Sequence, residues 1–564
     1  MAKTHEAVVD ALIEGGVSHA FTLPGLGITW SLPAFKAREN SLKVVLTRSE
    51  WIASIMAQVT GRLTGRPAVA MGQGPWMTTI GALGILEAHF AGTPMIALTE
   101  TSDYDGYGQM GVYQTMTGDY GGADAMASLR PITKYSTYAT SPSEAVYGVQ
   151  MAIKHANLPR KGPAAVVMKT PIIRAEMPET PSPRLYPSAG YHRYTPARVD
   201  ADALAELARL VAGAQRPVII AGNGVVSAQA GAALQALAEQ AGIAVVTSYN
   251  GKGVIAETSP VAAGMLGTWG HRCANLTLSR ADVVIVLGAS LGPDYLRFRD
   301  PDLIRPGQQK LVQVDIDPRN AGWVYPVDLA ITGDVGEVIS RLADVDLGAA
   351  RRESRQAAIA AVRAETGFDE RPTGTSAPGT VHHVDLINGL QNFIGPDDLI
   401  ALDAGSNRIW ATHALRNPYP GQFLVAGGTG AMGWGPPAAA AAKLVRPDRR
   451  VTCLAGDGGF MMTMQTISTA VQQQLDVVFL VDNNAGLGMV RDNLGANRIA
   501  VDFADCDFAR VAEGLGGRGI TVTAPDQITD ALAEAHRMGG PVVIDAKVDP
   551  EASHREACDT QPLR

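Results

Sequence analysis

Two polar segments, each directly after an apolar run, could together bind a metal ion and a phosphate. The first is Gly456-Asp457-Gly458-Gly459, and the second is Asp482-Asn483-Asn484. Because the carboxyl ends of neighbouring parallel strands lie side by side, the Asp457 carboxylate and the Asn484 side-chain carbonyl can reach one point. Such oxygen ligands suit Mg²⁺, which commonly shares its ligands with phosphates. The glycines let backbone N–H groups approach a phosphate at a helix N-terminus.

A Gly-Asp-Gly triplet alone is also typical of a strand-to-helix turn with a capping aspartate. The two segments together, however, resemble the diphosphate-binding signature of the thiamine diphosphate-dependent enzymes. The acetolactate synthase, pyruvate oxidase and 2-oxo acid decarboxylase group is the best match, and the resemblance covers essentially the whole chain. It implies that Mg²⁺ is bound by the side chains of Asp457 and Asn484 and by the backbone carbonyl of Gly486.

The same resemblance implies a set of cofactor contacts. Residues 427–437 are similar to the family's loop that holds the aminopyrimidine, and Met432 in this loop would keep the cofactor in its bent conformation. Residues 484–491 are similar to the stretch after the metal ligand. The expected cofactor-binding residues are Gly405, Ser406, Asn407, Gly430, Met432, Gly456, Asp457, Gly458, Gly459, Asn484, Gly486, Leu487 and Met489.

The chemistry of thiamine also needs a carboxylic acid beside the pyrimidine ring. Glu50 follows an apolar run and stands where the family has its activating glutamate, and burial there would raise its pKa. It is preceded by Ser49, whereas relatives usually have histidine. Tyr113-Gln114 resembles the Phe-Gln pair that many relatives point toward the reacting carbon. We therefore expect Glu50 and Gln114 to be catalytic.

Departures from the family pattern surround the expected substrate pocket. The segment Pro24-Gly25-Leu26-Gly27 looks like the loop whose backbone faces the substrate, and Trp30 makes it unusually apolar. Residues 72–76, Gly-Gln-Gly-Pro-Trp, depart from the common Gly-Pro-Gly pattern. Acetohydroxyacid synthases usually carry tryptophan at the position where this chain has Asn493. The predicted pocket, shaped for something other than the standard substrate, consists of Gly25, Leu26, Trp30, Trp76 and Asn493.

Alternating apolar strands and helices, which must position these residues, recur in three blocks. This rhythm predicts an α/β fold of three doubly wound domains with mainly parallel sheets. The expected units are a pyrimidine-binding domain over 1–185, a central Rossmann-like domain over 190–345, a diphosphate-binding domain over 365–550 and a tail over 551–564. Proline-rich residues 174–200 and residues 346–380 are predicted to be linkers. Charges between 551 and 556 predict a solvated tail.

The composition excludes several other classes of protein. The chain has 564 residues, a net charge of −8, 46% hydrophobic and 18% charged residues, which excludes a mainly disordered protein. The chain lacks a sustained basic tract, so we expect no nucleic-acid partner and no membrane partner. It also lacks a run of about 18 apolar residues, the length needed to span a bilayer. Four scattered cysteines are typical of reduced thiols, so we expect a cytoplasmic protein.

The function implied by the resemblance is cleavage or formation of a carbon–carbon bond with thiamine diphosphate and Mg²⁺. A carboligase of the acetolactate-synthase type, acting on a 2-oxo acid or related carbonyl substrate, is favoured. A decarboxylase or lyase for a less common 2-oxo acid, acyl-CoA or sulfonated donor stays open, as do a flavin-dependent oxidase and a non-catalytic relative. FAD is possible but not expected, because Ser227 replaces the third glycine after Gly222-Asn-Gly224. The resemblance also implies a homo-oligomer, a homodimer or homotetramer, with active sites at the subunit interfaces.

Overall fold

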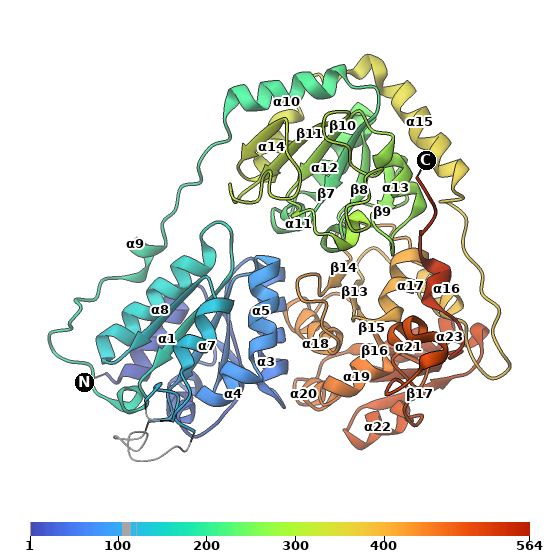
Figure 1. Cartoon of the computed structure of the whole chain (residues 1–564). Coiled ribbons are helices and arrows are strands. Elements are labelled where there is room, and N and C mark those ends of the chain that lie inside the picture. The colour runs from blue at the N-terminus through green and yellow to red at the C-terminus, as the bar shows by residue number, and fades with distance from the viewer. Residues whose placement is uncertain (1, 104–113, 120, 564) are drawn as a thin grey trace.

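The computed structural model describes residues 2–103, 114–119 and 121–563, and its chain forms three domains (Figure 1). Each domain is built on a six-stranded sheet, and the strands within each sheet are parallel. The strands are buried along nearly their whole length in the sheet centres, as expected when helices cover both faces. The predicted fold class, three doubly wound α/β domains, is confirmed.

The first sheet has the strand order β2-β1-β3-β4-β6-β5. Its strands are β1 (His19–Leu23), β2 (Lys43–Leu46), β3 (Ala68–Gly72), β4 (Met95–Glu100), β5 (Tyr135–Ala139) and β6 (Pro163–Met168). The surrounding helices are α1 (Thr4–Glu14), η1 (Ile28–Ser31), α2 (Leu32–Lys36), α3 (Glu50–Thr64), α4 (Gly74–Thr79), α5 (Ala82–Ala91), α7 (Ala125–Leu129), α8 (Pro142–Asn157) and η3 (Thr170–Arg174). The carboxyl ends of β2, β1, β3 and β4 are therefore consecutive along one edge.

The central sheet has the order β12-β11-β10-β7-β8-β9. Its strands are β7 (Pro217–Ala221), β8 (Ala244–Thr247), β9 (Ala262–Met265), β10 (Val283–Leu287), β11 (Lys310–Asp315) and β12 (Leu329–Thr332). Its helices are α10 (Ala201–Gly213), α11 (Asn223–Ser227), α12 (Gly231–Ala241), α13 (Arg272–Ser279), α14 (Val335–Leu342) and α15 (Arg352–Glu365). A short helix, α9 (Ser188–His192), lies in the connection from the first domain.

Helix α15 corrects the prediction that residues 346–380 form a linker. Ile359 and Val362 of this helix belong to the apolar core of the central domain. The buried Arg355 guanidinium donates to four backbone carbonyl oxygens, those of Val211, Ala214, Ala241 and Leu347. It thereby satisfies carbonyl groups at the C-terminal ends of α10 and α12, which lack partners within the helices. The charged pattern was that of an amphipathic helix, whose apolar side finds its partner only in the fold. Figure 1 shows α15 against this domain.

The third sheet has the order β14-β13-β15-β16-β18-β17. Its strands are β13 (Leu399–Leu402), β14 (Phe423–Val425), β15 (Val451–Gly456), β16 (Val477–Asn483), β17 (Arg518–Val522) and β18 (Val542–Lys547). Its helices are α16 (His383–Phe393), α17 (Ser406–Ala414), α18 (Gly435–Val445), α19 (Asp457–Thr463), α20 (Thr466–Gln472), α21 (Gly488–Leu494), α22 (Phe508–Gly514) and α23 (Ile528–Met538).

The first and third domains of the chain share one apolar core, in which α3 packs on α18 (Figure 1). Polar contacts reinforce this packing. The buried Glu87 carboxylate accepts from the backbone N–H groups of Gly428 and Thr429, and Arg62 donates to the carbonyl oxygen of Val425. The two domains that carry the predicted site are therefore fixed to each other.

The tail is docked on the protein, contrary to the prediction of a solvated segment. Glu551 and Glu556 are exposed, but His554 and Asp559 are buried. Asp559 receives hydrogen bonds from Asn275, Arg272 and Arg297 of the central domain. The charges of this segment were thus matched by partners that are remote in sequence.

Candidate active site

The predicted metal ligands meet at the carboxyl edge of the third sheet. Strands β15 and β16 pair in parallel register with Gly456 opposite Asp482. Asp457 therefore begins α19 close to the loop that follows β16. The backbone N–H of Gly486 donates to Asp457 Oδ2 at 3.1 Å, and that of Gly458 donates to Oδ1 at 2.7 Å. The expected proximity of the two polar segments is present in the structure.

The chemistry of these groups fits a divalent cation. In the described part of the chain, the buried Asn484 Oδ1 atom has no hydrogen-bond partner. Burial raises the pKa of Asp457 to about 7, and the two backbone donors offset this only in part. The Gly486 carbonyl oxygen accepts one hydrogen bond, from Gly488 N at 3.1 Å, and keeps a second lone pair. A divalent cation would give the Asn484 and Gly486 oxygens a partner and would stabilise the ionised form of the Asp457 carboxylate.

The loop that carries the ligands is held from behind. Arg491 is buried and donates through Nη2 to the carbonyl oxygens of Asn484 and Ala485, both at 3.2 Å. Ala485 has a φ of 52°, a left-handed conformation that non-glycine residues seldom adopt. Such strain is kept only where surrounding contacts enforce it. Among the described residues, no group of three or more His, Cys, Asp or Glu side chains is arranged so that it could hold a metal ion.

Other predicted cofactor-binding residues lie around Asp457 and Asn484 in two groups. In the first group, a methyl group on Gly458 would lie 2.7 Å from Leu487 Cδ2 and 3.3 Å from Met432 Cε, so both of these side chains lie close to Gly458. On the other side, a methyl group on Gly488 would lie 2.7 Å from Asn484 Nδ2 and 2.9 Å from Ser406 Oγ.

Gly405 directly precedes Ser406, a member of the second group. It has a φ of 126°, which requires glycine, and a methyl group there would lie 2.8 Å from Asn407 Oδ1. Gly456 faces the same Asn407 oxygen. Gly430 also has a positive φ, 62°, while Met489 packs at the margin of the neighbouring apolar core.

Asp403, which sequence reasoning passed over, supports the glycine-rich loop. It is fully buried and accepts from the backbone N–H groups of Gly433, Trp434 and Gly435 at 2.9–3.0 Å. Burial raises its pKa to about 6. Its position directly after β13 at the carboxyl edge was the signal that could have identified it.

Glu50 lies at the edge of the first sheet, at the N-terminus of α3. Ser49 caps this helix by accepting from Trp51 N at 3.1 Å, so the serine that replaces the family's histidine has a structural role. The Glu50 side chain packs on Gly72, where a methyl group would lie 3.0 Å from its Cγ atom. It is 5% exposed, and burial raises its pKa, as predicted.

Gln114 reaches the same edge, where its Oε1 atom accepts from Gln73 Nε2 at 2.9 Å. Tyr113, the other half of the predicted pair, lies outside the described residues. Gly25 packs against Gln73, and Leu26 beside it is exposed. Trp30 is half-buried under the Arg174 guanidinium, which lies 4.3 Å from its ring centre.

The predicted pocket residues do not all come together within one chain. Trp76 is exposed on α4 of the first domain, whereas Asn493 is exposed on α21 of the third. Among the described residues, no hydrogen bond joins the Glu50 or Gln114 side chain to the third domain. The predicted residues therefore form two groups, one at each sheet edge, which we call the half-sites.

Comparison with known proteins agrees with this division of the site. Residues 2–123, 204–342 and 403–546 match the N-terminal thiamine pyrophosphate-binding domain, the central domain and the C-terminal thiamine pyrophosphate-binding domain of the thiamine pyrophosphate enzymes. The chain belongs to the thiamine pyrophosphate enzyme family. The two sheet edges described above lie in these two matched domains.

Several similar members of this family are acetolactate synthases by name. A probable acetolactate synthase large subunit of Methanococcus aeolicus is 30% identical, over 97% of this chain and 92% of its own. Acetolactate synthase isozyme 1 large subunit of Escherichia coli K12 is 29% identical, over 97% and 94%. Acetolactate synthase of Bacillus subtilis is 27% identical, over 99% and 95%. This chain is therefore a thiamine diphosphate-dependent enzyme related to acetolactate synthases over its whole length.

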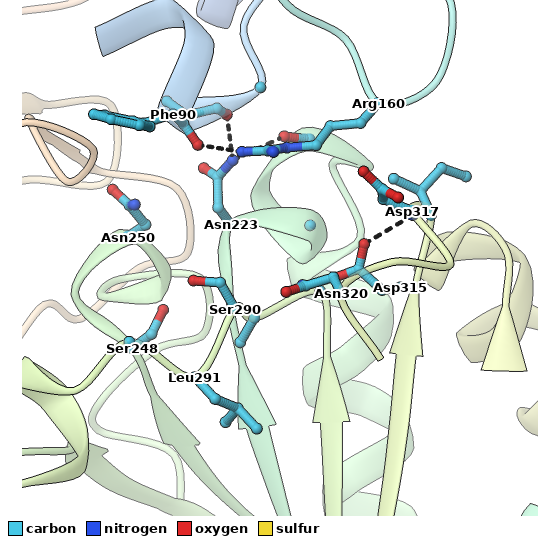
Figure 2. Close-up of a pocket in the computed structure, with 18 of the residues that line it drawn as sticks. Phe90, Arg160, Asn223, Ser248, Asn250, Ser290, Leu291, Asp315, Asp317 and Asn320 are labelled. Carbon is cyan, nitrogen blue, oxygen red and sulfur yellow. Dashed lines mark hydrogen bonds between the residues drawn. The ribbon is translucent and has the colours of Figure 1, made fainter. Parts of the chain in front are cut away.

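The central domain of this family member borders a cavity of about 950 Å³ (Figure 2). Arg160 of the first domain lies across it, but its guanidinium donates to the carbonyl oxygen of Phe90. The N–H groups of Gly222 and Gly224 donate to the carbonyl oxygens of Leu287 and Gly288. These two backbone N–H groups are therefore already paired and are not free to donate to a dinucleotide phosphate. In the described part of the chain, no helix is long and apolar enough to cross a membrane.

Proposed function

We propose that this enzyme is an acetolactate-synthase-like carboligase that uses thiamine diphosphate and Mg²⁺ to join carbon units taken from a 2-oxo acid. The observation that carries the proposal is the orphaned Asn484 carbonyl oxygen, in the loop whose Gly486 N–H donates to the buried Asp457 carboxylate. Asp457, Asn484 and the Gly486 carbonyl would hold Mg²⁺, and Ser406 and the N-terminus of α19 would face the diphosphate.

The proposed chemistry divides between cofactor and protein. Bound thiamine diphosphate supplies a carbon nucleophile and an electron sink for the carbanion left after carbon dioxide departs. Glu50 would hold and share a proton through its carboxyl oxygens with the pyrimidine ring, because burial favours its protonated form. Met432 and Leu487 would pack against the cofactor, and Gln114 would donate to the substrate.

We propose further that the active enzyme is a homodimer or a dimer of dimers in which the two half-sites of different subunits face each other. Apolar side chains rim both half-sites and are exposed in a single chain. Leu26, Trp76 and Ile80 lie at the first-domain edge, and Met461, Met462 and Val490 lie at the third-domain edge. Mutual coverage in a second copy of the chain would bury both rims.

The alternative is a decarboxylase or lyase that acts on a less common 2-oxo acid, an acyl-CoA or a sulfonated donor. One observation favours it. Gln73, Trp76 and Trp30 give the first-domain edge a polar amide and two large rings, and Gln73 contacts Gln114 directly. This edge would receive the donor substrate, so its altered shape and polarity would change which donor is accepted.

The test is turnover of pyruvate by the purified protein with thiamine diphosphate and Mg²⁺, with the carbon products identified by NMR. Acetolactate is the expected product, and its absence in the Glu50→Gln variant would tie the reaction to this site. If the cofactor binds but pyruvate is not consumed, the carboligase proposal fails for this donor. A panel of bulkier 2-oxo acids, acyl-CoA and sulfonated donors then tests the lyase alternative.

A further inference from the structure

A buried carboxylate organises the polar edge of the first domain. Glu100, at the end of β4, is fully buried, and its partners are hydrogen-bond donors. Its Oε1 atom accepts from Gly74 N at 3.1 Å and Ser102 Oγ at 3.2 Å. Its Oε2 atom accepts from Ser102 N at 2.5 Å and Thr170 Oγ1 at 2.6 Å. Because a backbone N–H can only donate, both carboxylate oxygens are acceptors.

This anchor fixes the direction of each hydrogen bond that follows. The Ser102 hydroxyl gives its one hydrogen to Glu100 and can therefore only accept from Gln73 Nε2, which lies 3.4 Å from Ser102 Oγ. The Gln73 amide nitrogen thus faces Ser102, and its second hydrogen goes to Gln114 Oε1 at 2.9 Å. The two sides of an amide are distinguished by such a network.

The orientation of Gln114 follows from this chain of donors. Since its carbonyl oxygen is taken by Gln73, its Nε2 group is the end left to face a ligand. Ser102 and Gln114 both have positive φ angles, 52° and 57°, which non-glycine residues adopt at a cost. The network ties these two strained residues to Gln73, which directly follows Gly72, the glycine on which Glu50 packs.

We infer that Gln73 and Glu100 are positioning residues that set the Gln114 amide so that its Nε2 group donates to an anionic or carbonyl oxygen of the donor substrate. The ligand class selected is a small carboxylate such as a 2-oxo acid, because an N–H donor favours it over a cationic or donor-rich group. This inference rests on the proposed function, which puts Gln114 beside the reacting carbonyl.

The main test replaces Gln73 by methionine, which keeps length but cannot hold the Gln114 carbonyl. In the holoenzyme with thiamine diphosphate and Mg²⁺, the KM for the 2-oxo acid consumed is expected to rise by about ten-fold or more, as for loss of a hydrogen bond to a charged group. The kcat and the affinity for thiamine diphosphate should change much less.

A matched control separates positioning from lost stability. Gln150 is also a buried glutamine of the first domain, with Nε2 donating to the Tyr186 carbonyl and Ser188 Oγ. Gln150→Met should therefore cost similar stability but leave KM unchanged. In a Gln114→Ala background, Gln73→Met should have no further effect on KM, because it acts through Gln114.

Two outcomes would overturn the inference. One is a Gln73→Met variant whose KM matches that of Gln150→Met, and the other is an effect that persists undiminished without Gln114. If the unmutated protein consumes no 2-oxo acid, the proposed function fails separately. Crystal structures then decide the positioning role, since the Gln114 amide must leave its present orientation in Gln73→Met but not in Gln150→Met.

Discussion

Mixing two inactive variants should restore activity if each active site is shared between subunits. Glu50→Gln removes the carboxyl group of one half-site, and Asp457→Asn removes the carboxylate that we propose as a metal ligand in the other. Each variant alone should retain about 1% of the unmutated activity or less. Loss of acid–base catalysis by Glu50 costs roughly 10²–10⁴-fold, and loss of the Asp457 carboxylate weakens the proposed binding of Mg²⁺. The two residues lie in different domains of the chain, at edges that no hydrogen bond of their side chains connects in the described residues.

The size of the rescue follows from the geometry. With random assembly of equal amounts, a shared site receives native Glu50 from one subunit and native Asp457 from the other with a chance of about one half each. The co-expressed mixture should then reach about one quarter of the unmutated activity, in dimers or in dimers of dimers. If both halves came from the same chain, each site would keep one defect and the mixture would stay near 1%.

The assay compares initial rates of 2-oxo acid consumption at equal protein concentration, with both variants carrying different affinity tags. A second mixture provides the control: unmutated chains with the Glu50→Gln/Asp457→Asn double variant. Sharing between subunits predicts about one quarter of full activity, whereas sites within one chain predict about one half. No rescue in the first mixture, with half activity in the second, would refute the assembly proposed above.

Three further predictions concern single residues. The pKa of Glu50 is raised in the fold, so the native state holds its proton more tightly than the unfolded chain, and this stabilisation is lost as pH rises through the native pKa. Glu50→Gln should therefore gain stability relative to the unmutated protein in guanidinium titrations as pH rises above 4.5, the ordinary pKa of glutamate. A stability difference that does not change with pH would contradict the burial argument. Asn484→Leu removes the orphaned oxygen and should weaken Mg²⁺ binding by about ten-fold or more in calorimetry with thiamine diphosphate present. Gly459→Ala would put a methyl group 2.0 Å from Asp403 Oδ2 and should destabilise the protein by roughly 1–3 kcal/mol, whereas Gly514→Ala, with nothing within 4 Å, should be neutral.

The fold class and the proximity of Asp457 to the loop that follows β16 could be predicted because both depend on local patterns. Apolar runs of strand length alternate with amphipathic helices, and a parallel sheet brings the residues after such runs to one edge. Asp457 and Asn484 could be paired for this reason. The prediction was wrong where a segment's partner was remote: charged α15 packs on the central domain, and the tail docks through Asp559.

The sequence by itself determined which chemistry this protein can support, because the residue types and their place after predicted strands carry that information. Only the tertiary structure decided which of these groups meet. The hydrogen-bond chain from Glu100 through Ser102 and Gln73 to Gln114 joins the ends of two strands to a remote loop. No residue spacing in the sequence predicts this chain of contacts. The physical reason is that a hydrogen bond depends on distance and direction in space, which are set when the sheet edges assemble.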